Sequence, residues 1–279
     1  MKCPKILSLL LMILLLSTGY ASAAPSQTLK IAAGDPEDSE MGVVGNAFKE
    51  YIEEKTKGDV EIQCFYSGSL GDESECLRNV QKGTLPMAMA GIANLVPFEK
   101  KLGLLTLPYL FSNIDEVVTG TNSAPAELLN SYATKSGFRI LTWTYTDFRY
   151  ISNAKRPITK MADMQGLKFR VPQSAVLIAA YKAFGGSPTP ISWAETFTAL
   201  QQGVVDGQCY GYIGFKANKF NEANQKYLID NGLQVSQLED EDVWKKAAME
   251  KVWPEMADFV GGKETINAYL KACGKPLWK

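Results

Sequence analysis

The 279-residue chain contains no histidine. Histidine is the most frequent general base, a usual member of catalytic triads and the commonest metal ligand in proteins. A Gly-x-Ser-x-Gly nucleophile motif is also missing. We therefore expect no catalytic residue, no metal site and no cofactor, although an exported enzyme that uses carboxylates or lysine remains an alternative.

Cysteine is sparse, and no two of the five cysteines form a Cys-x-x-Cys pattern. The absence of a Cys-x-x-Cys motif argues against a structural zinc site. Cys3 precedes the first apolar run, and the other four are Cys64, Cys76, Cys209 and Cys273. In an oxidising compartment four cysteines allow three complete disulfide pairings, and the sequence does not choose among them.

Neither sign of charge is in excess, since 29 Lys and Arg face 30 Asp and Glu. This balance gives no reason to expect nucleic acid or an anionic membrane as a partner. The chain has one long apolar run, residues 6–16, between a short basic start and Ala21-Ser22-Ala23. The pattern predicts a cleaved signal peptide, residues 1–23, and a soluble exported protein. The alternative is an uncleaved anchor, but the run is shorter than the roughly 20 residues of a membrane span.

Strand and helix patterns alternate along the first half of the chain. Residues 28–33, 60–66 and 85–90 predict strands, with helices after Val44 and after the cap residue Asp72. This order is typical of a parallel sheet with right-handed crossovers. Residues 102–111 predict a buried crossing segment and residues 123–135 a helix. Residues 138–145 and 148–153 predict two strands, either an antiparallel pair or one long strand between domains.

The same alternation restarts in the second half. Arg170 lies at the end of a short predicted strand, two residues before Pro172, and a helix follows. Residues 187–190 predict a Pro-rich turn. The pair Ser192 and Glu195 predicts a capping box at the start of a second helix, and another strand is expected to end at Gln208. From residue 239 the chain looks helical, with a break at residues 261–262. Two such units predict two lobes with a cleft between them, where ligands meet the carboxyl ends of strands.

Five motifs then occur in the order of a known family, and the chain resembles the DctP-type substrate-binding proteins of TRAP transporters (tripartite ATP-independent periplasmic transporters). The motifs are Ser67-Gly68-Ser69-Leu70-Gly71, Leu107-Pro108-Tyr109-Leu110-Phe111, Ser152-Asn153-Ala154-Lys155-Arg156-Pro157-Ile158, Gly166-Leu167-Lys168-Phe169-Arg170-Val171-Pro172, and Thr198-Ala199-Leu200-Gln201 with Val205-Asp206-Gly207-Gln208. The resemblance covers residues 29–228 continuously and resumes, out of step, near Leu233.

The resemblance implies an α/β, two-lobed periplasmic-binding-protein (Venus flytrap) fold in which helices flank a mostly parallel sheet in each lobe. We assign residues 24–145 to lobe I and 146–213 to lobe II. Residues 214–232 would form a shortened crossover, and 233–279 a C-terminal helical segment packed on the lobes. The implied function is periplasmic capture of a small organic acid and its delivery to a TRAP-type membrane permease, by a monomer.

The resemblance also implies a set of ligand-binding residues. Arg170 matches the carboxylate-clamping arginine of the family, and its planar fork suits a carboxylate. Arg149 matches a second arginine near the ligand in some members, with a structural ion pair as the alternative for either one. Trp193 matches an aromatic that packs on the ligand, or else a core aromatic. Gln173 either hydrogen-bonds the ligand or caps its helix.

Three departures from the family pattern affect this interpretation. Tyr210 stands near the position where many members carry an asparagine that reaches the ligand. Gly91 stands where members that bind sialic acid place a glutamate. The chain also lacks, after about Asp230, the strand and long helix that family members carry there. A shortened receptor that scavenges or senses, or a damaged copy, is therefore an alternative function. The aromatic residues Trp193, Tyr210, Tyr212 and Phe215 suggest a ligand with an apolar body.

Overall fold

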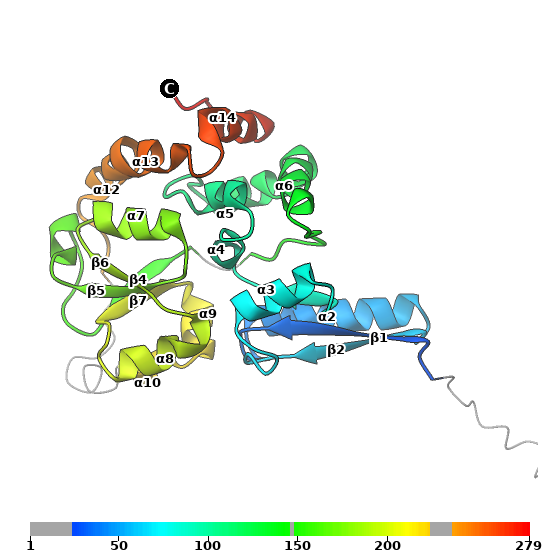
Figure 1. Cartoon of the computed structure of the whole chain (residues 1–279). Coiled ribbons are helices and arrows are strands. Elements are labelled where there is room, and N and C mark those ends of the chain that lie inside the picture. Colours follow the sequence, from blue (N-terminus) through cyan, green and yellow to red (C-terminus); the bar gives the residue numbers. More distant parts are fainter. Residues whose placement is uncertain (1–23, 146–147, 224–235) are drawn as a thin grey trace, which may run out of the picture.

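The computed structural model describes residues 24–145, 148–223 and 236–279. The predicted signal peptide and the predicted junction near Asp230 lie outside the described residues. Two α/β lobes face one another, with a group of helices above them (Figure 1). This arrangement of two α/β lobes confirms the predicted fold class.

Lobe I is built on a three-stranded parallel sheet of order β2-β1-β3. Its strands are β1 (Gln27–Ala33), β2 (Val60–Phe65) and β3 (Met87–Met89). Its helices are α2 (Glu40–Lys55), α3 (Glu73–Gln81), α4 (Ile92–Leu95), the 3-10 helix η1 (Lys100–Thr106), α5 (Ile114–Gly120) and α6 (Ser123–Lys135). The Asp72 carboxylate caps α3 by accepting the Glu75 N–H at 2.9 Å, as its sequence pattern predicts.

Lobe II has a four-stranded sheet of order β4-β7-β5-β6, in which only β4 is antiparallel to its neighbour. Its strands are β4 (Tyr150–Asn153), β5 (Lys168–Val171), β6 (Ser187–Pro190) and β7 (Gly207–Tyr210). Its helices are the 3-10 helix η2 (Met161–Met164), α7 (Ala175–Ala183), α8 (Trp193–Gln201), α9 (Tyr212–Ala217) and α10 (Phe220–Ala223).

The C-terminal region is helical, and both lobes pack against it. It comprises α12 (Glu241–Ala247), the π-helix η3 (Ala248–Val252), α13 (Trp253–Ala257) and α14 (Gly262–Ala272). The predicted break is present, since Gly261 and Gly262 have φ values of 94° and 89°, in the left-handed region that favours glycine. Among the described residues, none of the helices combines the length and hydrophobicity that a bilayer span requires.

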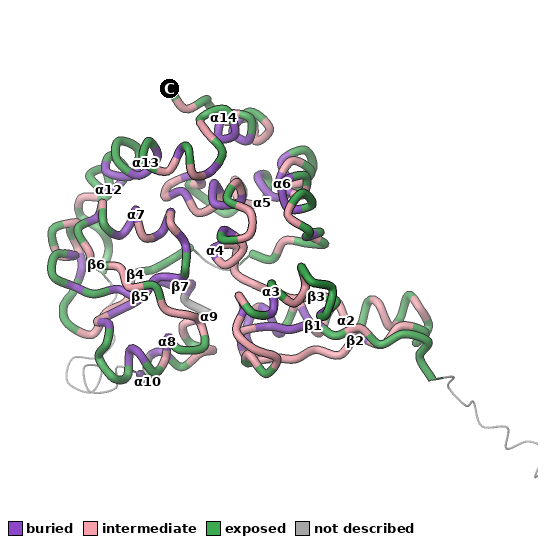
Figure 2. The backbone as a smooth tube through the Cα atoms, in the orientation of Figure 1, coloured by how far each residue is buried: buried purple, intermediate pink, exposed green. Residues whose placement is uncertain are grey.

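Two apolar cores share the C-terminal helices. Lobe I residues such as Leu102 and Leu129 pack with Val260, Ile266 and Tyr269, and all five are at most 1% exposed. In lobe II the residues of β5 and α7 pack with Trp244 and Val252. Met256 contacts both cores. In Figure 2 the second half of β1 and most of β5 are buried, whereas each helix shows a mixture of buried, intermediate and exposed residues.

The strand predicted over residues 138–145 is wrong. Phe138 is buried, but residues 139–145 have no strand assignment. Within the described residues their backbone makes one hydrogen bond, from the Ile140 N–H to Asn130 Oδ1 at 3.1 Å. A strand needs a paired neighbour, and the described residues supply none here. The strand predicted over 148–153 is present as β4.

Two predictions in lobe II are also wrong. Residues 187–190 form strand β6 instead of a turn, with Thr189 in register with Arg170. Two prolines are tolerated because β6 is the edge strand of its sheet, where a missing N–H disrupts no ladder. The last strand begins at Gly207, close to where the sequence predicts that it ends.

Candidate functional site

Four of the five predicted site residues meet in one stack at the face of lobe II that is turned toward lobe I. The Arg170 guanidinium lies 5.2 Å from the Trp193 ring centroid. The Trp193 and Tyr210 rings are 4.6 Å apart with an interplanar angle of 33°. The Arg149 guanidinium lies 6.0 Å from the Tyr210 ring. We call these four residues the arginine–aromatic stack. Attraction of each cation to an aromatic face holds the assembly together.

Arg170 is buried, with 2% of its surface exposed, and its position is fixed by the strand ends around it. It lies on β5, and its Nε donates to the Ile191 carbonyl at 3.0 Å. Burial, followed by the charge of Arg149, lowers the pKa of Arg170 to about 10. Within the described residues Arg170 makes no ion pair. A buried cation without an anion is costly, so this guanidinium is suited to receive an anionic group.

Gln208 lies beside Arg170 in the sheet and is also unpaired. The two residues are in register on β7 and β5. Gln208 is fully buried, and neither atom of its amide has a hydrogen-bond partner among the described residues. Buried polar groups are nearly always hydrogen-bonded in proteins. The region around Arg170 therefore contains buried hydrogen-bond donors and acceptors that no neighbouring side chain satisfies.

Arg149 holds its place through the backbone and sulfur of Cys209. Its Nη1 donates to the Cys209 carbonyl at 2.9 Å and approaches the Cys209 sulfur at 3.3 Å. Arg149 remains accessible to solvent because it lines a large interlobe cleft. Cys209 itself is buried, and all four cysteines after Cys3 are free thiols. The structure therefore contains none of the three possible disulfide pairings.

One carboxylate of lobe I, Asp35, faces the stack and joins the two lobes. Asp35 lies two residues after the end of β1 and is 1% exposed. It accepts hydrogen bonds from the Trp193 indole at 2.8 Å, the Tyr210 phenol at 2.8 Å and the Asn218 amide at 3.1 Å. In Figure 1 the β1 arrow ends toward α8 and α9. Trp193 begins α8, Tyr210 ends β7 and Asn218 follows α9. Three lobe II groups therefore converge on a single lobe I anion.

A second carboxylate, Glu73, lies next to Asp35. It is 7% exposed, and its Oε2 accepts the Gly91 N–H at 3.0 Å and a hydrogen bond from the Asn94 amide. Burial raises the pKa of Glu73 to about 7; the two hydrogen bonds oppose this, and the Asp35 charge adds to it. A Cβ on Gly34 would lie 2.8 Å from Glu73 Oε1 and 3.1 Å from Trp193 Cδ1, so Glu73 also faces the stack.

Gln173 is not brought into this group. It is exposed before α7, and no hydrogen bond of its side chain occurs within the described residues. The helix cap that Gln173 could have supplied comes from Ser174, whose hydroxyl accepts the Leu177 N–H at 3.4 Å. The capping box predicted for α8 is incomplete, because the Ser192 hydroxyl donates to the Glu195 carboxylate at 2.7 Å instead of accepting a backbone N–H.

A cleft of about 1730 Å³ extends from the stack along residues 138–145. Gly91, Arg149, Cys209 and Tyr210 line it where it reaches the stack. Most of its other lining is apolar and includes Phe111, Phe138, Ile140, Trp143, Leu177 and Phe184. This volume exceeds the roughly 300–1,000 Å³ of typical ligand pockets. Within the described residues no group of acidic or cysteine side chains is arranged to hold a metal ion.

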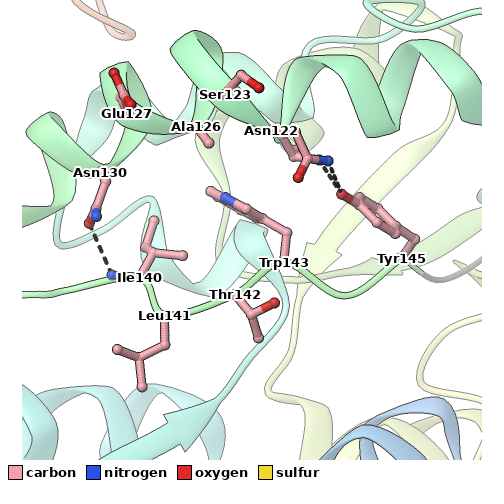
Figure 3. A pocket seen from close by; sticks show the side chains of 11 residues that line it. Asn122, Ser123, Ala126, Glu127, Asn130, Ile140, Leu141, Thr142, Trp143 and Tyr145 are labelled. Carbon is pink, nitrogen blue, oxygen red and sulfur yellow. Dashed lines mark hydrogen bonds between the residues drawn. The ribbon is translucent and has the colours of Figure 1, made fainter.

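A smaller pocket of about 300 Å³ lies in lobe I between α6 and residues 140–145 (Figure 3). Trp143 projects toward α6 within it, and the Tyr145 hydroxyl accepts a hydrogen bond from Asn122 at 3.0 Å. None of the predicted site residues lines this pocket. The arginine–aromatic stack, with Asp35 and Glu73, is therefore the better candidate for a functional site.

Sequence reasoning identified the stack but missed Asp35, Glu73 and Asn218. Asp35 stands at the carboxyl end of the first predicted strand, which is a position where ligands bind in α/β sheets. That position was the available signal for Asp35. Glu73 is harder to recognise, because an acidic residue in the first turn of a helix usually stabilises the helix dipole.

The chain is similar in sequence to known bacterial proteins. A family model described as "Bacterial extracellular solute-binding protein, family 7" matches residues 32–257. A solute-binding protein of Verminephrobacter eiseniae is 36% identical over 215 residues, which are 76% of this chain and 63% of the relative. The C4-dicarboxylate-binding periplasmic protein DctP of Vibrio cholerae is 32% identical over 65% of this chain and 54% of its own length. The chain thus spans less than two thirds of the length of these curated relatives.

Solved structures share the two-lobed fold. The sugar acid binding protein of Advenella mimigardefordensis, in complex with galactonate, superposes with a TM-score of 0.82 at 21% identity, over 90% of this chain and 99% of that chain. A TRAP periplasmic solute-binding protein of a Polaromonas species, bound to D-erythronate, gives 0.77 at 28% identity, over 87% and 98% of the two chains.

Proposed function

Because the chain belongs to bacterial extracellular solute-binding protein family 7, we propose that it binds a small organic acid between its lobes and delivers it to a TRAP-type membrane transporter. The acid would be captured in the periplasm, by a monomer. The carboxylate of the acid would pair with Arg170. Arg149 would be a second cation for the same ligand, and Trp193 and Tyr210 would form its aromatic wall. Gln173 remains a prediction for a further polar contact.

The observation that carries this proposal is the unpaired buried charge of Arg170. A guanidinium that is 2% exposed, next to a second arginine and without an ion pair among the described residues, lacks its natural counter-ion. A ligand carboxylate supplies that charge and can accept two parallel N–H bonds from the guanidinium. The relative that binds D-erythronate supports a small carboxylate as the ligand class.

Binding between lobes also gives the protein a way to signal that it is loaded. A ligand that contacts both lobes favours the arrangement in which they approach, by as much as its affinities for the two arrangements differ. The bonds from Trp193 and Tyr210 to Asp35 show that the lobes can meet at this point. A transporter could then distinguish loaded from empty receptor by the position of the lobes.

The proposal is tested by calorimetric titration of residues 24–279 with D-erythronate and with succinate. We expect Arg170→Ala to lose about 2–5 kcal/mol of binding free energy, as expected for truncating one partner of a buried charge pair. Arg78→Ala, which removes an exposed arginine of α3, serves as the control and should bind like the unmodified protein. Equal affinities for the Arg170→Ala variant and the unmodified protein would contradict the assigned role.

Delivery is tested separately, by uptake of labelled acid into vesicles that contain a TRAP-type transporter. Uptake should require the receptor and should fall with Arg170→Ala. Binding without receptor-dependent uptake would leave a binding protein that does not transport.

A further inference from the structure

The interlobe site contains negative as well as positive charge. Lobe II contributes Arg149 and Arg170, and lobe I contributes the carboxylates of Asp35 and Glu73. Both carboxylates are buried, at 1% and 7% exposure. Trp193 is the common neighbour, because it contacts the Arg170 guanidinium and donates to Asp35. Any ligand carboxylate held by the arginines would therefore lie close to two protein carboxylates.

The charge of Asp35 is not cancelled by a cation. Its three hydrogen-bond donors are the neutral groups of Trp193, Tyr210 and Asn218. Within the described residues, no salt bridge involves Asp35. Neutral donors stabilise a carboxylate without removing its field. Asp35 is therefore a fixed negative charge in a site where burial weakens solvent screening.

The net charge of the site limits the charge of the ligand that it can bind. Arg149 and Arg170 are cationic, Asp35 is anionic, and Glu73 carries only part of a charge near neutral pH because burial raises its pKa to about 7. These groups leave an excess of at most one positive charge. One ligand carboxylate neutralises this excess, whereas a second would add an unmatched negative charge beside Asp35.

We propose that Asp35 makes the interlobe site selective for monocarboxylates and against dicarboxylates. The rest of the preferred ligand carries uncharged hydrogen-bond donors, as in a hydroxy acid, since hydroxyl groups can donate to the two lobe I carboxylates. This inference rests on the proposed function and deepens it. The names of the relatives cover both a C4-dicarboxylate and D-erythronate, so family membership leaves the choice to the residues of this chain.

The test compares two probe acids of similar size, D-erythronate and succinate, by calorimetric titration of residues 24–279. The unmodified protein should bind D-erythronate at least tenfold more tightly than succinate. Asp35→Asn keeps the shape of the side chain and one acceptor oxygen but removes the charge. It should shift the ratio of the two affinities toward succinate by at least tenfold. The control is Asp59→Asn, the same charge change at an exposed position of lobe I, which should leave the ratio unchanged.

A second variant distinguishes an effect of charge from a structural effect of the Asp35 substitution. Glu73→Gln removes the neighbouring carboxylate and should shift the ratio in the same direction when measured at pH 8, where Glu73 is ionised in the unmodified protein. If Asp35 only held Trp193 and Tyr210 in place, Asp35→Asn would weaken both acids equally and leave the ratio unchanged, which overturns the inference.

The outcomes also separate this inference from the proposed function. Succinate that binds the unmodified protein as tightly as D-erythronate contradicts the selectivity and leaves acid binding intact. Failure of both acids to bind contradicts the proposed function and the selectivity that depends on it.

Discussion

The carboxylate of Glu73 lies against the backbone of Gly91, whose N–H donates to Glu73 Oε2 at 3.0 Å. Gly91 is the position where related receptors for sialic acid are expected to carry a glutamate. A Cβ at Gly91 would be 3.8 Å from Glu73 Oε2, so a carboxylate from another helix lies close to that position. Asn94 donates to the same oxygen and fixes its direction.

This placement predicts a pH-dependent stability that Glu73→Gln should remove. The pKa of Glu73 is about 7 in the folded protein, compared with 4.5 for an unperturbed glutamate, the value expected in the unfolded chain. Because the folded state favours the protonated Glu73 carboxyl, the folded protein is most stable, as far as Glu73 is concerned, below pH 4.5. It loses this stability as the pH rises from 4.5 through 7. The variant should therefore gain stability relative to the unmodified protein between pH 5 and pH 8, by up to about 3 kcal/mol.

Urea unfolding of both proteins at pH 5 and pH 8 measures this difference. Glu75→Gln, an exposed change in the same helix, is the matched control and should show no such trend. A constant difference between the Glu73→Gln variant and the unmodified protein across this range would show that Glu73 has an ordinary acidity in the fold.

The four free thiols predict a two-stage reaction with a thiol reagent. Cys64 and Cys273 are partly exposed, whereas Cys76 and Cys209 are buried. With residues 24–279 and Ellman's reagent, we expect two thiols to react in the folded state and four in urea. Burial raises the pKa of Cys273, so this thiol should react more slowly than an unburied thiol. Fewer than four thiols in urea would reveal a disulfide.

The packing of lobe I predicts very different costs for the same substitution at two leucines. Leu129 on α6 is fully buried, and Leu129→Ala should cost about 2–5 kcal/mol, since it leaves a cavity. Leu141, in the unpaired stretch 139–145, is 61% exposed, and Leu141→Ala should change stability by less than about 0.5 kcal/mol. Denaturant unfolding measures both. A large loss for Leu141→Ala would mean that this stretch is packed as a strand after all.

The hydroxyl of Tyr269 predicts a smaller, specific loss. Tyr269 is fully buried and donates to the Gly120 carbonyl at 2.7 Å. Tyr269→Phe keeps the ring and should cost about 1–2 kcal/mol, because the carbonyl loses its partner. Tyr51, which is 58% exposed, offers the matched change, and Tyr51→Phe should be nearly neutral by thermal unfolding. Equal melting temperatures for the two variants would argue against the Tyr269 bond.

The parts of the fold that periodicity predicts are those that depend on local sequence and burial together. Residues 28–33 form a strand because Ile31, Ala32 and Ala33 lead the chain into the buried part of the sheet, and α6 matches its predicted range. The prediction for 138–145 failed because strand-forming residues do not reveal whether a partner is present. For residues 187–190 the sequence predicts a turn and the structure contains a strand, because proline is acceptable in a strand at the edge of a sheet.

The candidate site was predictable to a similar extent. A resemblance to known receptors located Arg170, Arg149, Trp193 and Tyr210, and the structure brings these four together. It did not locate Asp35, because its role depends on how the two lobes meet. Contacts between residues 158 positions apart in the chain leave no local pattern in the sequence.

The sharing of the C-terminal helices by both cores has a consequence for the order of folding. The lobe I core is completed by Trp253, Val260 and Ile266, near the opposite end of the chain from β1. Such long loops must close before the contacts stabilise them, which slows folding. During synthesis the first lobe therefore cannot finish its core before the second has emerged. Because both cores depend on the same C-terminal helices, we expect the two lobes to unfold together in one cooperative transition.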